Sequence, residues 1–340
     1  MQQLQAPLLY PVAACKHQRN FSLTQPSRRS CLFKARSDRR QAQHASPRSR
    51  LHARVTAAAA PQLAEGPNGL QKVLLKNSSG GSAEVFLHGA SVTSWKSDKG
   101  EELFFLTKKA IYAPPKPIRG GIPLCFPQFG PFGNIQNHGF ARNSVFELSS
   151  GSEDSVTLSL TPTTDLHRTF PHDFQLLVTV KLESNSLTQT LEVENRSSEP
   201  MPLGVAFHTY FAVSDVDSVH VDLGSPGLTF LDGTQGKAQK KLDGSTVKLQ
   251  EEWDAIFTGT GDTLKLVDEK AGRTITIKKD KNLPDAVVWN PWEEKANGFA
   301  DMAEGEWRTF VCLEPALAAS GPTQVQPGQT WTCTQVLSVS

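Results

Sequence analysis

Residues 117–143 read PIRGGIPLCFPQFGPFGNIQNHGFARN, a stretch in which four prolines and five glycines are interspersed with four phenylalanines. Proline removes a backbone donor and glycine weakens helices and strands, so this composition predicts a structured loop. The side chains of Arg119, His138 and Arg142 lie among the aromatic residues, and rigid loops that carry such groups usually face a ligand. The alternative is a long surface connection with solvated arginines, which would leave the phenylalanines as an apolar patch.

Short runs that are apolar, or that alternate between apolar and polar residues, dominate the chain after this loop and before it. Turn-forming pairs such as Asp232-Gly233 and Pro327-Gly328 separate the runs, and few windows show the 3.6-residue apolar period of a helix. We therefore predict an all-β fold, a large sandwich or barrel whose consecutive strands pair antiparallel. The predicted strands are residues 72–76, 83–87, 91–95, 102–106, 156–160, 174–182, 186–193, 203–207, 219–223, 263–267, 274–278, 286–289, 309–314 and 330–339.

The N-terminal segment differs in composition from the rest of the chain. Residues 1–55 hold eleven arginines and lysines against the single acid Asp38, with many serines and no long apolar run. This composition is typical of an organelle transit peptide and unlike a secretory signal. We predict a disordered transit peptide over residues 1–60, directed to the chloroplast stroma, with the mitochondrion as the alternative; a basic tail that binds nucleic acid is the other interpretation.

No linker-rich boundary and no internal repeat divides the remaining chain, so we predict a single domain over residues 61–340. The formal net charge is +1 for the whole chain, but the basic excess lies in the leader, so this domain is acidic. Nucleic-acid binding needs a broad basic surface, and a membrane span needs roughly twenty apolar residues. The sequence offers neither, so we expect a monomer that binds a small molecule and neither nucleic acid nor a membrane.

Cysteine and histidine spacing gives no sign of a metal site. Cys125, Cys312 and Cys333 follow the leader and each lies beside apolar residues, so we expect buried free thiols, with a catalytic nucleophile as the alternative. The histidines are scattered, without the short spacings of a zinc site. We predict no metal and no cofactor.

Two apolar segments each contain one residue that could transfer a proton. His208 lies within a run that we expect to be a strand, where a satisfied core histidine is the alternative. Glu314 follows an apolar run at the expected end of a strand, where a solvated or ion-paired terminus is the alternative. Burial raises the pKa of a carboxyl towards neutrality and histidine titrates nearby, so together they suit acid and base catalysis on a neutral polyol.

Taken together, six segments make this chain resemble the aldose 1-epimerases of the galactose-mutarotase-like superfamily, and among them the hexose-phosphate branch. Their order and spacing cover nearly all of residues 71–340. The segments are IRGGIP at 118–123, FPQFG at 126–130, HGFARN at 138–143, FHTYF at 207–211, NPW at 290–292 and CLEP at 312–315.

The resemblance implies a large antiparallel β-supersandwich that binds a sugar on its concave face and interconverts its α and β anomers at C1. By this analogy Glu314 takes the proton from the C1 hydroxyl and His208 protonates the ring oxygen. The ring opens, rotation about C1–C2 presents the other carbonyl face, and reclosure gives the other anomer. Two groups of near-neutral pKa suffice for this chemistry.

The resemblance also implies substrate contacts. His138 matches a residue that holds sugar hydroxyls or assists the acid, and Asp254 matches a substrate-binding aspartate. Asn137 stands where relatives carry a glutamine that contacts the substrate, and its shorter side chain could still donate. Arg119 and Arg142 match arginines that contact a phosphate, and bidentate cationic donors suit a sugar phosphate better than a neutral sugar. Glucose 6-phosphate, or a related hexose 6-phosphate, is the substrate so implied.

Two alternatives remain at this point. One is a mutarotase for unphosphorylated aldoses, and the other is a non-catalytic carbohydrate-binding protein on the same sandwich. Trp289 and Trp292 could stack on a sugar in either case, or belong to the core. The presence of both His208 and Glu314 favours catalysis, because binding alone needs no acid and base.

Overall fold

The computed structural model describes residues 60–131, 133–321 and 323–340. The predicted transit peptide lies almost entirely outside these residues. The described residues belong to one compact unit, Thr56–Ser340. No helix among them is long and apolar enough to cross a membrane.

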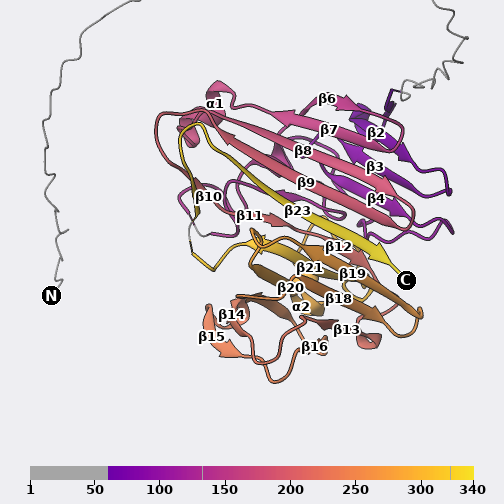
Figure 1. Cartoon of the computed structure of the whole chain (residues 1–340). Coiled ribbons are helices and arrows are strands. Elements are labelled where there is room, and N and C mark those ends of the chain that lie inside the picture. Colours follow the sequence, from indigo (N-terminus) through magenta and orange to yellow (C-terminus); the bar gives the residue numbers. More distant parts are fainter. Residues whose placement is uncertain (1–59, 132, 322) are drawn as a thin grey trace, which may run out of the picture. The chain divides into compact units, whose positions relative to one another are not determined.

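A nine-stranded antiparallel sheet forms one layer, and its strands β6 to β9 and β23 run side by side in Figure 1. Its long strands alternate buried and partly exposed residues along most of their length, as expected for a sheet with one face on the core. In spatial order the strands are β16 (Thr246–Lys248), β13 (Val219–Asp222), β18 (Thr263–Asp268), β19 (Arg273–Lys279), β23 (Thr330–Val339), β9 (Ser186–Asn195), β8 (Phe174–Glu183), β7 (Ser155–Leu160) and β6 (Glu147–Gly151).

An eight-stranded antiparallel sheet forms the layer that carries the site. Its strand β21 is buried at every position, because it lies in the middle of the sheet with both faces covered. In spatial order the strands are β15 (Ala238–Lys241), β14 (Thr229–Asp232), β17 (Trp253–Phe257), β20 (Asp285–Asn290), β21 (Phe310–Leu317), β11 (Val205–Phe207) and β5 (Leu124–Cys125), and β12 (Tyr210–Ala212) also pairs with β21.

Two smaller sheets and a few short helices complete the described structure. All named strand pairs are antiparallel, and both α-helices have six residues, so the predicted all-β antiparallel fold is confirmed. The remaining elements are β1 (Gln62–Glu65), β2 (Gln71–Lys76), β3 (Ser82–Phe86) and β4 (Val92–Lys96) in one sheet, β10 (Met201–Leu203) and β22 (Thr323–Val325) in the other, α1 (Thr164–Thr169), α2 (Trp292–Asn297), and the 3-10 turns η1 (Pro67–Gly69), η2 (Ala141–Asn143), η3 (Val216–Ser218), η4 (Gly233–Gln235) and η5 (Glu306–Thr309).

The main hydrophobic core joins the two large sheets. Phe207, Val288 and Leu313 of the eight-stranded sheet share one cluster with Leu191 and Leu337 of the nine-stranded sheet. The opposite face of the eight-stranded sheet carries a smaller cluster, and this face holds the site described below. Its members are Cys125, Phe129, Ala206, Ile256, Val287 and Ala316.

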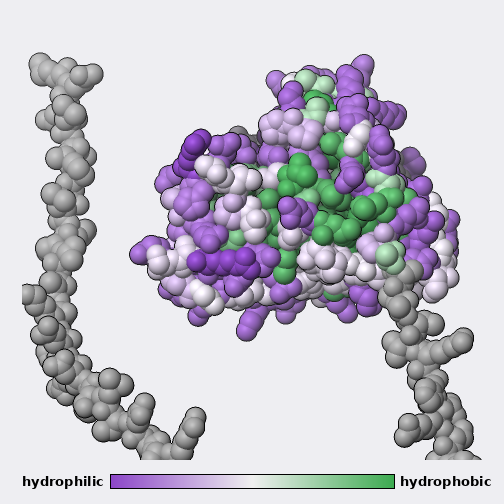
Figure 2. Space-filling view, turned by 90° about the horizontal axis from the view of Figure 1, so that it is seen from above, coloured by the Kyte–Doolittle hydropathy of each residue, from purple (hydrophilic) through white to green (hydrophobic). Residues whose placement is uncertain are grey.

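Polar side chains cover much of the surface, with one visible exception. Figure 2 shows hydrophobic residues gathered into a patch bordered by polar ones on the face seen from above. Among the described residues, the exposed large hydrophobic side chains are those of Leu63 and Val145, with exposed fractions of 50% and 60%.

Two predicted strands do not form as single strands in the structure. Residues 102–106 form isolated bridges and no strand, because the Glu102 carboxylate accepts the backbone N–H groups of Trp95 and Phe104 and so interrupts the ladder. Residues 203–207 divide at Gly204 into β10, which pairs with β22, and β11, which pairs with β21.

Candidate active site

The loop that opened the sequence analysis folds back on itself, as its prolines and glycines predicted. Gly139 has φ of 68°, and a Cβ at this position would lie 2.1 Å from the carbonyl oxygen of Phe126. That same oxygen accepts the N–H groups of Phe140 and Ala141 at 2.9 and 3.2 Å. Because only glycine permits this close approach, the return of the chain fixes the positions of His138 and Arg142 on either side of it.

Glu314 lies within β21, and the predicted strand end at this residue is wrong. The proline that follows it explains the error. Pro315 has no N–H to offer the neighbouring β11, and the Phe207 carbonyl instead accepts the N–H of Thr209 at 2.7 Å and its hydroxyl at 3.1 Å. The strand therefore breaks between β11 and β12, and His208 lies in this break. The prediction that His208 lies within a strand is wrong.

His208 and Glu314 meet at that break. The His208 Nδ1 lies 3.2 Å from a carboxylate oxygen of Glu314, and their side chains are 9% and 1% exposed. The two groups are within ion-pair range, yet their geometry does not make a hydrogen bond: neither this nitrogen nor either Glu314 oxygen has a hydrogen-bond partner in the described part of the chain. Buried carboxylates are normally paired, so this one is available to a ligand.

Burial shifts the pKa values of both groups in opposite directions. Burial raises the pKa of Glu314 well above its usual range, the nearby Asp254 raises it further, and Arg142 offsets part of this rise. Burial lowers the pKa of His208, and the positive charges of Arg142 and Arg119 add to this effect. Burial therefore favours the uncharged form of each group, and the two groups titrate as a coupled pair that can pass a proton to and from a ligand.

His138 is oriented as a hydrogen-bond donor. Its Nδ1 accepts the N–H of Gly130 at 3.3 Å and lies 3.3 Å from the Cys125 sulfur, so the proton of the neutral ring is on Nε2. Burial, followed by the charge of Arg142, lowers the pKa of His138 to about 3. The His138 ring lies 5.4 Å from that of His208, so a neutral N–H donor stands beside the acid and base pair.

Arg142 lies on η2 and donates to the backbone carbonyl of Asn137 at 3.1 Å, while its Nε is buried without a hydrogen-bond partner. The influence of its charge on His138, His208 and Glu314 places it at the site. Asn137 is exposed, and the structure shows its backbone, not its side chain, supporting Arg142.

Arg119 reaches the site from the start of the loop. Its Nε lies 2.9 Å from the Asp301 carboxylate, and its guanidinium lies 4.4 Å from the centre of the Phe299 ring. Asp301 and Phe299 belong to the segment between α2 and η5. This arginine therefore already has an internal anionic partner that the sequence did not predict.

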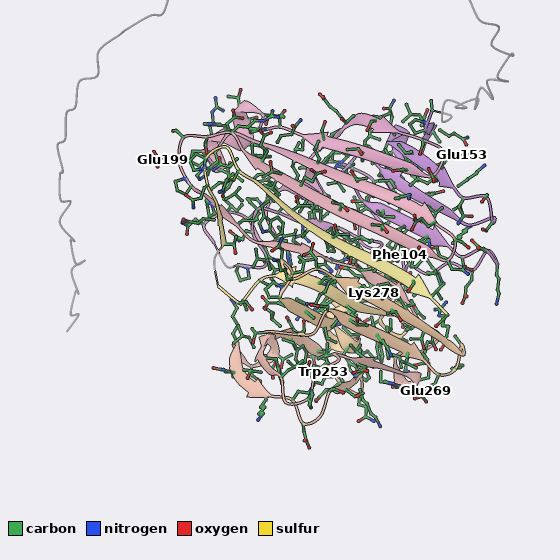
Figure 3. The ribbon with its side chains drawn as sticks, viewed as in Figure 1. Phe104, Glu153, Glu199, Trp253, Glu269 and Lys278 are labelled. Carbon is green, nitrogen blue, oxygen red and sulfur yellow. The ribbon has the colours of Figure 1, made fainter. Side chains whose placement is uncertain are left out.

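Asp254 lies on β17 and faces the same side of the sheet as Glu314. The register pairs Asp254 with Trp289, while Ile256, Val287 and Glu314 lie opposite one another on neighbouring strands. Asp254 is 3.4 Å from the Lys295 ammonium. Trp253, the residue before it, is labelled in Figure 3.

Aromatic rings enclose the pair. Tyr210 stacks on His208 with ring centres 4.9 Å apart and planes 6° apart, and Trp289 meets the His208 ring edge-on at 5.9 Å. Sequence reasoning did not identify Tyr210, although its position two residues after His208 could have suggested a shared face. Trp292, in contrast, packs on Trp307, with ring centres 4.5 Å apart.

Cys125, Cys312 and Cys333 are free and buried, as predicted. Cys125 contacts His138, and Cys312 lies beside His208 and Glu314. The Cys312 sulfur, a His208 ring nitrogen and a Glu314 oxygen lie within 4.8 Å of one another, a grouping that the sequence analysis did not foresee.

Two cavities adjoin these residues without including the pair. One of about 740 Å³ is lined by Phe129 and Leu231 among others, and one of about 400 Å³ by Asp254 and Trp253 among others. Because Glu314 is fully buried, a ligand reaches it only when neighbouring side chains move.

Comparisons with known proteins identify the family of the chain. The family model described as aldose 1-epimerase matches residues 71–338. A protein of Cenchrus ciliaris named "Putative glucose-6-phosphate 1-epimerase" is 37% identical over 79% of this chain and 85% of its own length. A protein of the same name from Escherichia coli K12 is 31% identical over 70% of this chain and 80% of its own.

Solved structures show the same fold. The crystal structure of a "putative mutarotase" from Salmonella typhimurium matches with a TM-score of 0.74 and 25% identity, over 83% of this chain and 94% of that one. A galactose mutarotase related enzyme from Lactobacillus acidophilus matches with a TM-score of 0.67 and 19% identity, over 79% and 97%. These matches confirm the predicted galactose-mutarotase-like supersandwich.

Proposed function

The chain belongs to the aldose 1-epimerase family, and on this premise we propose that it interconverts the α and β anomers of glucose 6-phosphate or a related hexose 6-phosphate. The buried, unpartnered Glu314 beside His208 is the observation that carries the proposal. An acid and base pair of this kind can open and close a hemiacetal ring without further groups. The names of the relatives in Cenchrus ciliaris and Escherichia coli support the choice of substrate.

In the proposed reaction Glu314 accepts the proton of the C1 hydroxyl while His208 donates one to the ring oxygen. The electron pair of the O1–H bond forms the C1 carbonyl, and the pair of the C1–O5 bond takes the proton from His208. After rotation about C1–C2, His208 recovers its proton from the O5 hydroxyl and Glu314 returns its own to O1. The pair ends each turnover with the single proton with which it began.

Substrate binding would shift the proton of the pair from Glu314 to His208, where the proposed reaction needs it. In the empty site the positive charges of Arg119 and Arg142 help to lower the pKa of His208. A bound phosphate dianion would offset these charges, so the pKa of His208 would rise and the imidazolium and carboxylate form would become more populated. Phosphate binding and proton placement are thereby coupled.

The Nε2 proton of His138 and the carboxylate of Asp254 would hold sugar hydroxyls, each on one side of the catalytic pair. Trp289 would border the sugar ring, because it contacts His208 and lies on the same sheet face as Asp254. The roles of these residues and the contact at Asn137 remain proposals.

One observation favours the second candidate, a mutarotase for neutral aldoses: Arg119 is already neutralised by Asp301. The discriminating experiment is polarimetry with freshly dissolved α-glucose 6-phosphate, α-glucose and α-galactose. Faster equilibration of the phosphate alone would support the proposal. Equal acceleration of all three would favour the neutral-aldose candidate, and no acceleration would favour a binding protein.

Arg119→Ala should raise KM for glucose 6-phosphate by about 10- to 100-fold and change KM for free glucose little. A charged hydrogen bond contributes about 1.5–3 kcal/mol, and each 1.4 kcal/mol is about tenfold. Arg308 gives a matched control, because it also lies over an aromatic ring, at 4.5 Å from Trp307, and pairs with an acid, Asp217. An equal loss with both sugars would show that Arg119 is structural.

Asp301→Asn should lower KM for glucose 6-phosphate by about two- to fivefold, because it removes the carboxylate that competes with the phosphate for Arg119. The effect is small since both side chains of this pair are about 20% exposed. Asp217→Asn, which removes one of the two carboxylates that pair with Arg308, should leave KM unchanged. A rise in KM for Asp301→Asn would mean that Asp301 orients Arg119 and does not compete for it.

A further inference from the structure

Three donor atoms of different kinds converge on one point of the site. Cys312 and Glu314 lie two residues apart on β21, and side chains at this spacing share one face of a strand. His208 reaches the same point from the break between β11 and β12. The sulfur, the ring nitrogen and the carboxylate oxygen all lie within 4.8 Å of one another, and all three residues are buried.

A second observation indicates that this point can hold a ligand. Both oxygens of Glu314 and the Nδ1 of His208 are buried without a hydrogen-bond partner among the described residues. A buried carboxylate without a partner costs free energy that a bound cation would recover. The third donor, Cys312, is 0% exposed and in no disulfide.

We infer that Cys312, His208 and Glu314 form an inhibitory binding site for Zn²⁺, with water as the fourth ligand. Zinc accepts sulfur, nitrogen and oxygen donors at about 2.0–2.3 Å in a tetrahedral arrangement. Such distances separate neighbouring ligand atoms by roughly 3.3–3.7 Å, so atoms now within 4.8 Å reach this geometry through small side-chain movements. When the metal binds, the proton of the Cys312 thiol and the single proton of the His208 and Glu314 pair are both released to solvent.

The donor set determines which cations compete. A thiolate and an imidazole favour Zn²⁺ or Co²⁺ over the hard cations Mg²⁺ and Ca²⁺, which prefer six or more oxygens. The charges of Arg119 and Arg142, which act on His208, weaken the binding of any cation here. Zinc therefore binds reversibly, as an inhibitor that a chelator removes.

Inhibition follows from the identity of the ligands and rests on the proposed function. A metal bound to Glu314 and His208 occupies the lone pairs that the proposed proton transfers use. Zinc and sugar thus exclude each other, and inhibition is competitive. Metal binding itself does not depend on which sugar the site accepts.

The test of binding uses Co²⁺ with the full chain, free of any tag, in which the leader residues Cys15 and Cys31 are replaced by serine. Cobalt bound to a thiolate gives near-ultraviolet charge-transfer absorption and visible bands of tetrahedral coordination. We expect these bands at one equivalent and their displacement by Zn²⁺ but not by Mg²⁺. Cys312→Ser should abolish the charge-transfer band, whereas Cys333→Ser, which alters an equally buried thiol on β23, should retain it.

The test of inhibition compares the same proteins in the anomer assay. Zn²⁺ should raise the apparent KM, and chelation should restore activity. In Cys312→Ser and Cys312→Ala, inhibition measured against each variant's own zinc-free rate should be weaker, on the order of tenfold or more. Their thermal unfolding would verify that both variants are folded. Cobalt bands that survive in Cys312→Ser, or no bands with the parent chain, would overturn the inference. If the parent chain shows the cobalt bands but no activity in the anomer assay, the metal site stands and the proposed function is refuted.

Discussion

Glu314→Gln is expected to lower kcat for anomer exchange by about 10²- to 10⁴-fold, the usual contribution of a positioned general acid or base. The amide has nearly the same shape as the carboxyl but cannot accept the C1 proton. Because no described residue hydrogen-bonds either Glu314 oxygen, the substitution removes no existing bond. Sugar-phosphate binding should therefore persist, as measured by calorimetry beside the rate by polarimetry.

Glu304→Gln provides the control, since Glu304 is an exposed acid on the segment that carries Asp301. Its rate should equal that of the wild type. Near wild-type turnover in Glu314→Gln would show that Glu314 does not transfer a proton in the reaction. Lost turnover together with lost binding would instead indicate that Glu314 holds the sugar.

His208→Asn is expected to lower kcat to a similar extent, because the ring oxygen then loses its proton donor.

The wild-type pH profile of kcat/KM should be bell-shaped. The pair is active when it holds one proton. At low pH the value of kcat/KM falls because His208, whose pKa is lowered, takes up a second proton. At high pH it falls because Glu314, whose pKa is raised, releases the remaining proton. The acid limb should disappear from the residual activity of His208→Asn.

His220→Asn is the matched control, because His220 also lies within 3.3 Å of a glutamate, Glu269, but on β13. It should leave both the rate and the pH profile unchanged. An acid limb that persists in His208→Asn would assign that limb to another group. His138 is not that group over the range near neutrality, since its pKa is about 3.

The fold could be predicted largely from local sequence. Alternation with a period of two and frequent turn pairs identified the long strands β8, β9 and β23 because each depends on residues close together in the chain. Glu102 shows the limit of this approach. Its carboxylate binds N–H groups of Trp95 and Phe104, a contact that alternation does not encode.

The site was predictable in its residue types but not in its geometry. The segments around His208 and Glu314 were recognisable, yet the break that brings them together arises from Pro315 acting on the neighbouring strand. The sequence also did not predict that Cys312 and Tyr210 lie beside His208. Their approach to His208 follows from the pairing of β12 with β21, in which Tyr210 lies opposite Cys312.

Asp301 was missed because its contact with Arg119 joins distant parts of the chain. The family resemblance implied a phosphate contact for Arg119, and the charge of this residue gave no sign of an internal competitor. The pairing links the predicted loop to the segment after α2. Selectivity between phosphorylated and neutral sugars depends on this link in our proposal.

The most direct test of the central claim is exchange NMR on an equilibrium mixture of the two glucose 6-phosphate anomers, with and without the purified protein. Cross-peaks between the α and β H1 signals report ring opening and closing without any coupled enzyme. We predict cross-peaks at catalytic protein concentrations that vanish with Glu314→Gln. An exchange rate equal to the uncatalysed rate, with the protein folded and free of metal, would contradict the claim that His208 and Glu314 catalyse this reaction.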